Sequence, residues 1–425
     1  MKIGVISDLH LGYRQYGLKE REEDFYFEYQ NVINQLVYDE NVDLIINCGD
    51  TFDSANPSPK AIGQFANGLD VLREAGVKML NVVGNHTMLQ VKDHFPADNL
   101  FLDDFEYELL DENIFFIDQD ASVFIAGVPF HTMTKGDAFL EKVSFLNDKA
   151  KESKCKVTIL CIHQAIVPFC GSFGGEFDVN DLMVDNFSLI FCGHIHHKEK
   201  FGNFYQVGSL ERSSMTEFVD YEENGKGYSI VEIDDGDVSV RDVDVVLKRK
   251  FLHFLVSDFE SIDSLKVCFH NLIDTCDVAP VVCIEGDVSE DQYYDLVDFK
   301  KAIDKMVVFC KLKISLIPDG CVCNDVDTSF EDLTVEGSFQ RYFDSHDVIE
   351  PHRNLTLDIY NTIKYDDESS KVHLNDLVDN YFELNYNIDN FKDMEKELKD
   401  VIADYTKFFD NLGGNIYENK TKNST

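Results

Sequence analysis

The chain of 425 residues has no long apolar segment. No uninterrupted apolar run reaches the roughly 18 residues that cross a bilayer, so we expect no membrane-spanning helix and no membrane partner. The first residues pass quickly into polar ones, which is unlike a signal peptide. We therefore expect a protein that is not secreted and that works in the cytoplasm, at the nucleoid or, if viral, in the cytoplasm of its host.

Basic side chains are also scarce. The sequence has 38 Lys and Arg residues against 79 Asp and Glu residues, for a formal net charge of -41. The acidic excess is present in both halves of the chain, so no single tail explains it. Lys and Arg normally supply affinity for duplex DNA. A nucleic-acid protein of this composition would need local basic clusters, bound divalent cations, a partner protein or a high-salt environment.

Paired cysteine motifs are missing as well. The eleven cysteines are scattered, and several lie in apolar runs, as Cys161 and Cys192 do. Only one residue separates Cys321 from Cys323, whereas zinc-binding and dithiol motifs usually have two. We expect reduced, buried thiols that act as small hydrophobic side chains.

Short apolar runs of β type alternate with helical stretches through the first half of the chain. Strands are expected at residues 2–7, 42–48, 77–83, 122–128, 156–162 and 187–192, and helices at residues 22–38, 59–75 and 136–153. This alternation predicts an α/β fold with helices on the faces of a sheet. Loops that leave the carboxyl ends of such strands gather at one edge, so distant residues can converge there.

The remainder of the chain has a different pattern. We expect a first domain over residues 1–247, a second α/β unit over 251–360, a linker over 361–372, two amphipathic helices over 373–412 and a flexible tail over 413–425. Strands of the second unit are expected at residues 251–256, 281–285 and 307–316. The two late helices either pack on the preceding domain or form a hairpin that binds a partner.

Five polar clusters follow predicted strands directly. They are Asp8-Leu9-His10, Gly49-Asp50-Thr51-Phe52-Asp53, Gly84-Asn85-His86, Ile162-His163-Gln164 and Gly193-His194-Ile195-His196. Their carboxylates, imidazoles and amide oxygen suit manganese, iron or zinc. Seven candidate ligands are too many for one tetrahedral ion. We therefore expect two divalent ions that share a carboxylate.

A pair of divalent ions indicates cleavage of a phosphate ester, because two cations can bind phosphoryl oxygens and activate a water without a Ser or Cys nucleophile. Gly49, Gly84 and Gly193 would let the backbone turn sharply beside the ligands. An isolated histidine usually belongs to a structural hydrogen-bond network. We expect His197 on the surface or facing the substrate. We expect a structural role of this kind for the remaining histidines, which are His94, His131, His253, His270, His346, His352 and His373.

The order of the five clusters resembles that of the calcineurin-like metallophosphoesterases. Within them, residues 8–17 followed by Glu20-Arg21-Glu22-Glu23-Asp24-Phe25 resemble the double-strand-break repair nucleases of the meiotic-recombination-eleven and SbcD type. The resemblance covers about the first 215 residues most strongly. It implies a two-sheet sandwich flanked by helices, a smaller α/β capping domain that binds DNA and a C-terminal helical hairpin.

This resemblance also implies roles for individual residues. Asp8, His10 and His196 would hold one metal ion, and Asn85, His163 and His194 the other. Asp50 would bridge both ions, and manganese is the expected metal. His86 would be the catalytic residue that stabilises the transition state or protonates the leaving oxygen.

The activity implied by the resemblance is DNA end processing in double-strand break repair and recombination. Such proteins act as 3′-to-5′ exonucleases on double strands and as endonucleases on single strands. They form homodimers and bind a coiled-coil ABC-type ATPase of the Rad-fifty or SbcC type through a C-terminal helix pair. Residues 373–412 occupy the corresponding place in this chain.

Two positions depart from the usual pattern, and several basic residues are candidate DNA contacts. Thr87 stands where relatives have an acidic residue, so the partner that orients His86 differs. Asp53 stands where some relatives have a histidine, which leaves the balance of exonuclease and endonuclease action open. The candidate DNA contacts are Tyr13, Arg14 with Lys19 and Arg21, Lys198, Lys200, Lys248, Arg249 and Lys250, with a solvated charged surface as the alternative for each.

Two other functions remain open. The first is a phosphatase or cyclic-nucleotide phosphodiesterase of the same fold, acting on a small or protein phosphoester. Against it, residues 51–55 and 80–83 lack the arginines that protein phosphatases of this superfamily place there. The second is a non-catalytic scaffold at DNA ends, but such a protein would be expected to lose metal ligands, and all seven are present.

Overall fold

The structure is a computed structural model that describes residues 1–317 except 89–95, 103, 105, 112–114, 170–175 and 216. The chain divides into two compact units, Met1–Gly320 and Cys321–Thr425. Several predictions fall outside the described residues, namely the end of the second α/β unit, the linker, the helical hairpin, the tail, Cys321, Cys323, His94, His346, His352 and His373. The predicted domain boundaries stay predictions.

Two six-stranded sheets form the centre of the first unit. The first sheet has the order β14 (Asp237–Asp244), β13 (Gly227–Asp234), β1 (Lys2–Ile6), β2 (Leu44–Asn47), β3 (Lys78–Asn81) and β4 (Tyr107–Leu109). The second has the order β11 (Glu199–Phe201), β12 (Phe204–Gln206), β10 (Leu189–Gly193), β7 (Val157–His163), β6 (Val123–Val128) and β5 (Phe116–Asp118). Strands β1 to β4 are parallel, as are β6, β7, β10 and β12. A short parallel pair, β8 (Ile166–Val167) and β9 (Phe177–Asp178), lies apart from them.

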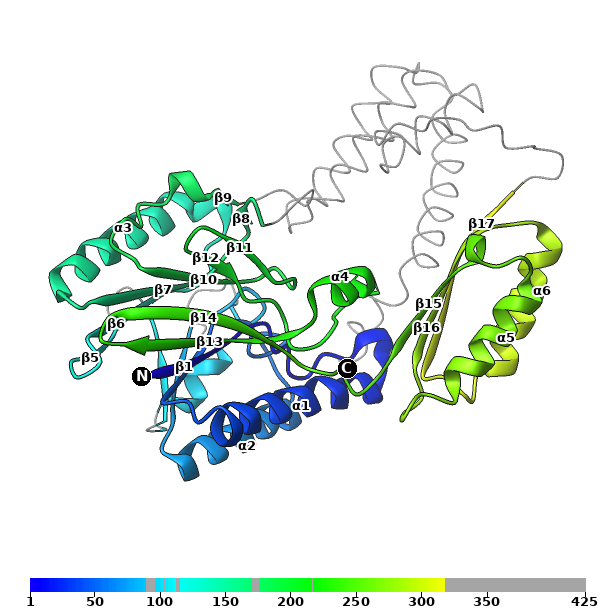
Figure 1. Ribbon diagram of the computed structural model, residues 1–425, viewed down its shortest axis with the longest axis horizontal. Coiled ribbons are helices and arrows are strands. Elements are labelled where there is room, and N and C mark those ends of the chain that lie inside the picture. The colour runs from blue at the N-terminus through cyan, green and yellow to red at the C-terminus, as the bar shows by residue number, and fades with distance from the viewer. Residues whose placement is uncertain are drawn as a thin grey trace, which may run out of the picture. The chain divides into compact units, whose positions relative to one another are not determined.

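Helices cover the outer faces of both sheets, as Figure 1 shows. Helices α1 (Lys19–Asn34) and α2 (Pro59–Ala75) pack on the first sheet, and α3 (Gly136–Ser153) packs on the second. The predicted bounds of α2 and α3 are confirmed to the residue. In α2, Oγ of Ser58 accepts a hydrogen bond from the Ala61 N–H (3.1 Å), and Gly76 ends the helix with a φ of 69°. Ser caps and Gly ends of this kind are favoured at helix termini.

Alternate residues of the strands separate two sides of each sheet. In β1, Ile3 and Val5 belong to the core between the sheets, whereas Ile6 packs toward α1 and α2. Side chains from both sheets, such as Ile46 and Ile159, fill the central layer. The predicted two-sheet sandwich flanked by helices is therefore confirmed.

A smaller α/β unit follows residue 250. It has three parallel strands, β15 (Phe251–Leu255), β16 (Val281–Val288) and β17 (Phe309–Leu316), with helices α5 (Ile262–Ile273) and α6 (Glu290–Ile303) on one face. Both helices begin with a capping box, at Ser261 and at Ser289. All three strands were predicted within two residues of their observed starts. The expected small α/β unit is thus present in the described residues.

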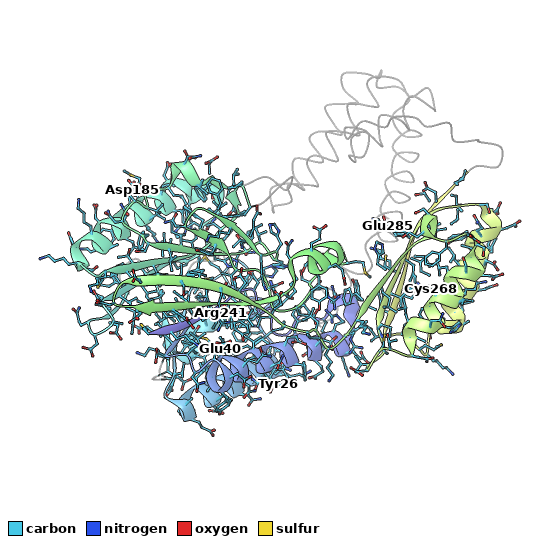
Figure 2. All side chains as sticks on the ribbon, in the orientation of Figure 1. Tyr26, Glu40, Asp185, Arg241, Cys268 and Glu285 are labelled. Carbon is cyan, nitrogen blue, oxygen red and sulfur yellow. The ribbon has the colours of Figure 1, made fainter. Side chains whose placement is uncertain are left out.

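Ion pairs between distant segments tie the first domain together. Figure 2 labels one of them, between Arg241 of β14 and Glu40, which follows the π-helical turn Gln35–Asp39 after α1. Arg21 of α1 and Glu211 form another with a distance of 3.3 Å, and both side chains are buried. Buried pairs of this kind fix the geometry of the elements they join more than they add net stability.

Glu28 of α1 predicts a pH dependence of stability. It is fully buried and accepts a hydrogen bond from the Lys248 N–H (3.2 Å). Burial raises its pKa from 4.5 to about 7, with a smaller contribution from Glu211. Because the folded pKa lies above the unfolded one, the stability that the protonated form contributes is lost as pH rises from about 5 to about 8.

We therefore expect Glu28→Gln to remove part of this loss. Relative to the wild type, the free energy of unfolding of Glu28→Gln should be higher at about pH 8 than at about pH 5, by as much as about 3 kcal/mol. Urea unfolding of both proteins in the presence of a chelator measures it, because contributions of the metal-binding histidines cancel in the comparison. Identical pH dependence of the two proteins would show that Glu28 does not titrate in this range.

Candidate metal centre

All five polar clusters lie at the carboxyl ends of their strands. Asp8 and His10 follow β1, Asp50 follows β2, and Asn85 follows β3. From the second sheet, His163 ends β7, and His194 and His196 follow β10. The first two loops are joined directly, because the N–H groups of Asp8 and His10 donate to the carbonyls of Gly49 and Asp50 at 3.0 Å.

Several of the candidate ligands have an unfavourable backbone conformation. The φ angles of Asp8, His10, Asp50 and His194 are 53°, 45°, 49° and 84°. Non-glycine residues rarely adopt the left-handed region, and such strain concentrates at functional sites. The sharp turns allow consecutive side chains to point into one site instead of alternating across a strand.

The three glycines predicted to allow close approach do so. A Cβ on Gly49 would overlap the ring of His163, and one on Gly84 would overlap the carboxylate of Asp50. A Cβ on Gly193 would overlap the carbonyl of Cys48 and the hydroxyl of Ser7. Glycine is therefore required at these positions by the packing of the ligands themselves.

Asp8, His10 and His196 form the first group of potential ligands. Their ligand atoms lie within 4.8 Å of one another. Nε2 of His10 is 3.1 Å from Nε2 of His196, which in turn is 3.9 Å from Oδ1 of Asp8. The N–H of His194 and the hydroxyl of Ser7 donate to the Asp8 carboxylate at 3.1 and 2.6 Å and fix its orientation.

Asp50, His163 and His194 form the second group, and Asn85 completes it. The Oδ1 atom of Asn85 is 3.0 Å from Nε2 of His163 and 2.8 Å from Nδ1 of His194. Oδ2 of Asp50 is 3.1 Å from Nε2 of His163 and 4.0 Å from Nε2 of His10. Asp50 thus lies between the two groups. The structure brings all seven predicted ligands together, and their division between two ions stays a prediction.

The electrostatics of these residues suit divalent cations. Burial opposes ionisation of Asp50, but His163, followed by His10, holds the pKa of Asp50 well below its usual range. Burial alone would lower the pKa of His163, yet Asp50 raises it to about 9. Burial and then His163 lower the pKa of His194 to about 4. A site that favours a proton on a buried imidazole favours a metal cation for the same reason.

The donor set also fits metal ions. Nδ1 of His163 is 2.8 Å from the carbonyl of Cys48 and donates to it, which directs Nε2 toward Asp50 and Asn85. Nδ1 of His10 is buried and has no hydrogen-bond partner among the described residues. Imidazole, carboxylate and amide oxygen are ligands of borderline divalent ions. The group can therefore hold such ions.

His86 lies at the open side of the centre. Its side chain is 40% exposed, its Nδ1 is 3.0 Å from the carbonyl of Asp53, and its N–H donates to Oδ1 of Asp50 at 2.9 Å. Thr87 is fully buried, and its hydroxyl donates to the carbonyl of Gly84 at 3.4 Å. Thr87 therefore does not orient the His86 ring, which is instead hydrogen-bonded to the backbone carbonyl of Asp53.

Three residues around His196 escaped the sequence analysis. Nδ1 of His196 is 2.7 Å from Oγ of Ser213 and 3.3 Å from Oε1 of Glu217. The fully buried Lys226 holds Glu217 at 2.8 Å. Burial opposes protonation of His196, but Glu217 raises its pKa. Ser213, Glu217 and Lys226 stand outside the five clusters, so no local pattern indicated them.

Three of the predicted basic contacts have side chains that face inward. Arg249 is 7% exposed, bonds to Asp24 at 3.0 Å and donates to the carbonyl of Ala279. Arg21 is fully buried beside the same aspartate. The side chain of Lys198 is 7% exposed and pairs with Asp244 at 2.6 Å. These residues are already used for internal ion pairs.

The other candidate contacts remain at the surface. Arg14, Lys19, Lys200, Lys248 and Lys250 are exposed, and Tyr13 is half-buried. Several nevertheless have intramolecular partners. Arg14 pairs with Glu22 at 2.7 Å, Lys200 lies over the ring of Tyr205, Lys248 lies over Phe27, Lys250 bonds to Thr275, and the Tyr13 hydroxyl donates to the Ser213 carbonyl at 3.3 Å.

The remaining described histidines lie outside this centre. Nδ1 of His131 is 2.7 Å from the carbonyl of Pro129, His197 pairs with Glu199 at 3.2 Å, and the ring of His270 packs against Phe269. His253 groups with Cys283 and Glu285, but Glu285, labelled in Figure 2, also pairs with Lys313 at 2.6 Å. That lysine competes with any cation there. His253 thus keeps its structural interpretation.

Comparison with known proteins agrees with this geometry. Residues 1–198 match the family described as calcineurin-like phosphoesterase. The match ends just after His196, so the matched residues include all seven candidate ligands and His86.

Curated relatives extend the similarity beyond these residues. The chain is 28% identical to the DNA double-strand break repair protein Mre11 of Methanocaldococcus jannaschii over 71% of this chain and 81% of that one. It is 26% identical to Mre11 of Methanococcus maripaludis over 91% of this chain and 100% of that one. It is 31% identical to Mre11 of Thermoplasma acidophilum over 55% of this chain and 63% of that one. The predicted resemblance is confirmed. No helix among the described residues is long and apolar enough to cross a membrane.

Gly84 offers a direct test of the metal centre. We expect Gly84→Ala to abolish binding of manganese, because the new methyl group would displace the Asp50 carboxylate. Gly63→Ala is the matched control, since nothing lies within 4 Å of its added Cβ and Ala is favoured inside a helix such as α2. Isothermal titration with Mn²⁺ measures both variants. Unchanged binding by Gly84→Ala would place the metal elsewhere.

Proposed function

We propose that this chain is a two-metal-dependent DNA nuclease that processes DNA ends in double-strand break repair. One observation carries the proposal above all others: donors from five loops and two sheets converge on Asp50. A fold that brings seven metal-type ligands to one edge, some through strained backbone, is organised around that site. The phosphoesterase match assigns the site to ester hydrolysis.

Asp8, His10 and His196 would hold one ion and Asn85, His163 and His194 the other, with Asp50 between them. When bound, divalent ions at this centre would stabilise negative charge on phosphoryl oxygens and lower the pKa of bound water. Manganese is the metal we expect from the family resemblance, and the mixed imidazole and oxygen donors suit it as they suit iron or zinc.

His86 is the residue placed to act on the leaving group. Its Nδ1 donates to the Asp53 carbonyl, and its Nε2 lies 4.0 Å from Oδ2 of Asp50. In the imidazolium form Nε2 also carries a proton, which can be donated to a departing oxygen. The hydrogen bond from the backbone N–H of His86 to Oδ1 of Asp50 keeps His86 next to the metal centre.

DNA as substrate is supported by the relatives and by the sequence around Tyr13. All three relatives described above are named as double-strand break repair proteins. The candidates for phosphate contacts that remain at the surface are Tyr13, Arg14, Lys19, Lys200, Lys248 and Lys250. In so acidic a chain, the metal ions themselves would provide much of the positive charge that meets the substrate.

Further features of the proposed nuclease follow from the family resemblance. We propose 3′-to-5′ exonuclease action on double strands, endonuclease action on single strands, a homodimer and a coiled-coil ATPase as partner. Residues 373–412 would bind the ATPase, and the unit after residue 250 would act as the capping domain. Location at the DNA of the cell follows from this role.

Hydrolysis of DNA is the experiment that tests the proposal. We expect purified protein with Mn²⁺ to degrade linear duplex DNA, slowly alone and faster with its ATPase and ATP. His86→Ala should retain metal binding and lose cleavage by about a hundredfold or more, because proton transfer contributes about 10²–10⁴-fold. Gel assays of labelled DNA and Mn²⁺ titration measure the two effects separately.

His197→Ala is the matched control, since His197 is adjacent in sequence to His196 but pairs with Glu199. It should cut DNA at the wild-type rate. The nuclease proposal fails if the wild-type protein hydrolyses only small phosphate esters with every metal tried.

A further inference from the structure

A closed set of polar contacts surrounds the candidate ligand His196. Nδ1 of His196 is 2.7 Å from Oγ of Ser213, and the Ser213 hydroxyl donates to Oε1 of Glu217 at 2.6 Å. Oε2 of Glu217 is 2.8 Å from Nζ of Lys226. Lys226 in turn donates to the backbone carbonyl of His196 at 2.5 Å. The contacts therefore begin at the ring of His196 and end at its own backbone.

The residues of this set come from separate parts of the chain. His196 follows β10, Glu217 is the first residue of α4 (Glu217–Asn224), and Lys226 directly precedes β13. Lys226 is 0% exposed, and the side chain of Glu217 is 13% exposed. A buried ammonium group is unfavourable unless it is paired, and such a pair adds little net stability. The main effect of the pair is to fix the groups that it contacts.

The direction of the hydrogen bonds determines which ring nitrogen of His196 carries the proton. A carboxylate paired with a lysine only accepts, so the Ser213 hydroxyl gives its one proton to Glu217. The Ser213 oxygen can then only accept from His196, which requires a proton on Nδ1. Nε2 is left with its lone pair. This atom lies 3.1 Å from Nε2 of His10 and 3.9 Å from Oδ1 of Asp8.

We propose that Glu217, together with Ser213 and Lys226, is a positioning residue for one of the two ions. It holds the tautomer of His196 in which Nε2 is free and faces the other two ligands of the first group. Lys226 fixes the backbone of the same histidine. Glu217 lies on the Nδ1 side of the ring, so it acts through His196 and not on an ion directly. The inference rests on the proposed function only in that the centre is taken to bind two divalent ions.

The proposed role concerns the first group of ligands and not the second. Nδ1 of His163, in the second group, donates to the backbone carbonyl of Cys48. That contact does not involve Glu217 or Lys226. A change at Glu217 should therefore weaken one ion and leave the other in place.

Glu217→Gln in the full-length protein tests this role. The amide group of glutamine can donate to Ser213, so the hydroxyl would donate to Nδ1 and the ring proton would move to Nε2, where it blocks an ion. We expect the wild type to bind two Mn²⁺ ions, and Glu217→Gln to bind one of them about ten- to a hundredfold more weakly. Titration followed by the electron paramagnetic resonance signal of free Mn²⁺ measures both affinities without DNA or turnover.

Glu223→Gln is the matched control, because it makes the same change at an exposed position of the same helix. It should bind both ions as the wild type does. If Glu217→Gln does not fold, the double variant Glu217→Gln with Lys226→Met decides the question, since it removes both buried charges and leaves neither unpaired. The double variant should weaken the same single ion.

A second titration separates an effect through His196 from a general loss of structure. In a His196→Ala background, Glu217→Gln should cause no further loss of Mn²⁺ affinity, because the two residues act as one unit. A further loss in that background would overturn the positioning role. Equal weakening of both ions, or wild-type affinity for both ions in Glu217→Gln, would overturn it as well.

These outcomes are separate from those of the proposed function. A wild-type protein that does not bind two Mn²⁺ ions would contradict the two-metal centre and this inference with it. Two tightly bound ions in both the wild type and Glu217→Gln would contradict only the inference about Glu217. Cleavage of DNA enters neither measurement.

Discussion

The buried carboxylate of Asp50 is the constraint on which the rest of the site depends. It is 1% exposed, and a charge so deeply buried would cost several kcal/mol without compensation. Compensation comes from His163 of the second sheet at 3.1 Å, from His10 of the first at 4.0 Å and from the His86 N–H at 2.9 Å. Asp50 therefore needs donors from both sheets at once.

The sandwich meets this need at one edge. Parallel strands β1, β2 and β3 end beside β7 and β10, and the loops after them have no room for extra side chains at Gly49, Gly84 and Gly193. Left-handed backbone at Asp8 and His194 turns their side chains inward. Behind the edge, the buried side chain of Asn81, the last residue of β3, is hydrogen-bonded to that of Asn47, the last residue of β2.

Much of this arrangement could be predicted from sequence, for physical reasons. Helices α2 and α3 were predicted to the residue because apolar periodicity is a local signal. The seven donors were predicted because each follows a strand. Glu217 could not be predicted, since it meets His196 only through folding. The burial of Arg249 could not be predicted either, because a lysine-arginine run looks alike whether it faces solvent or, as here, Asp24.

Anomalous scattering from a crystal grown with Mn²⁺ is the most direct test of the two-metal centre. Two peaks about 3.5–4 Å apart are expected. One should lie among Asp8, His10 and His196, the other among Asn85, His163 and His194, with the Asp50 carboxylate between them. A single peak, or peaks away from Asp50, would contradict the two-metal centre and the mechanism built on it.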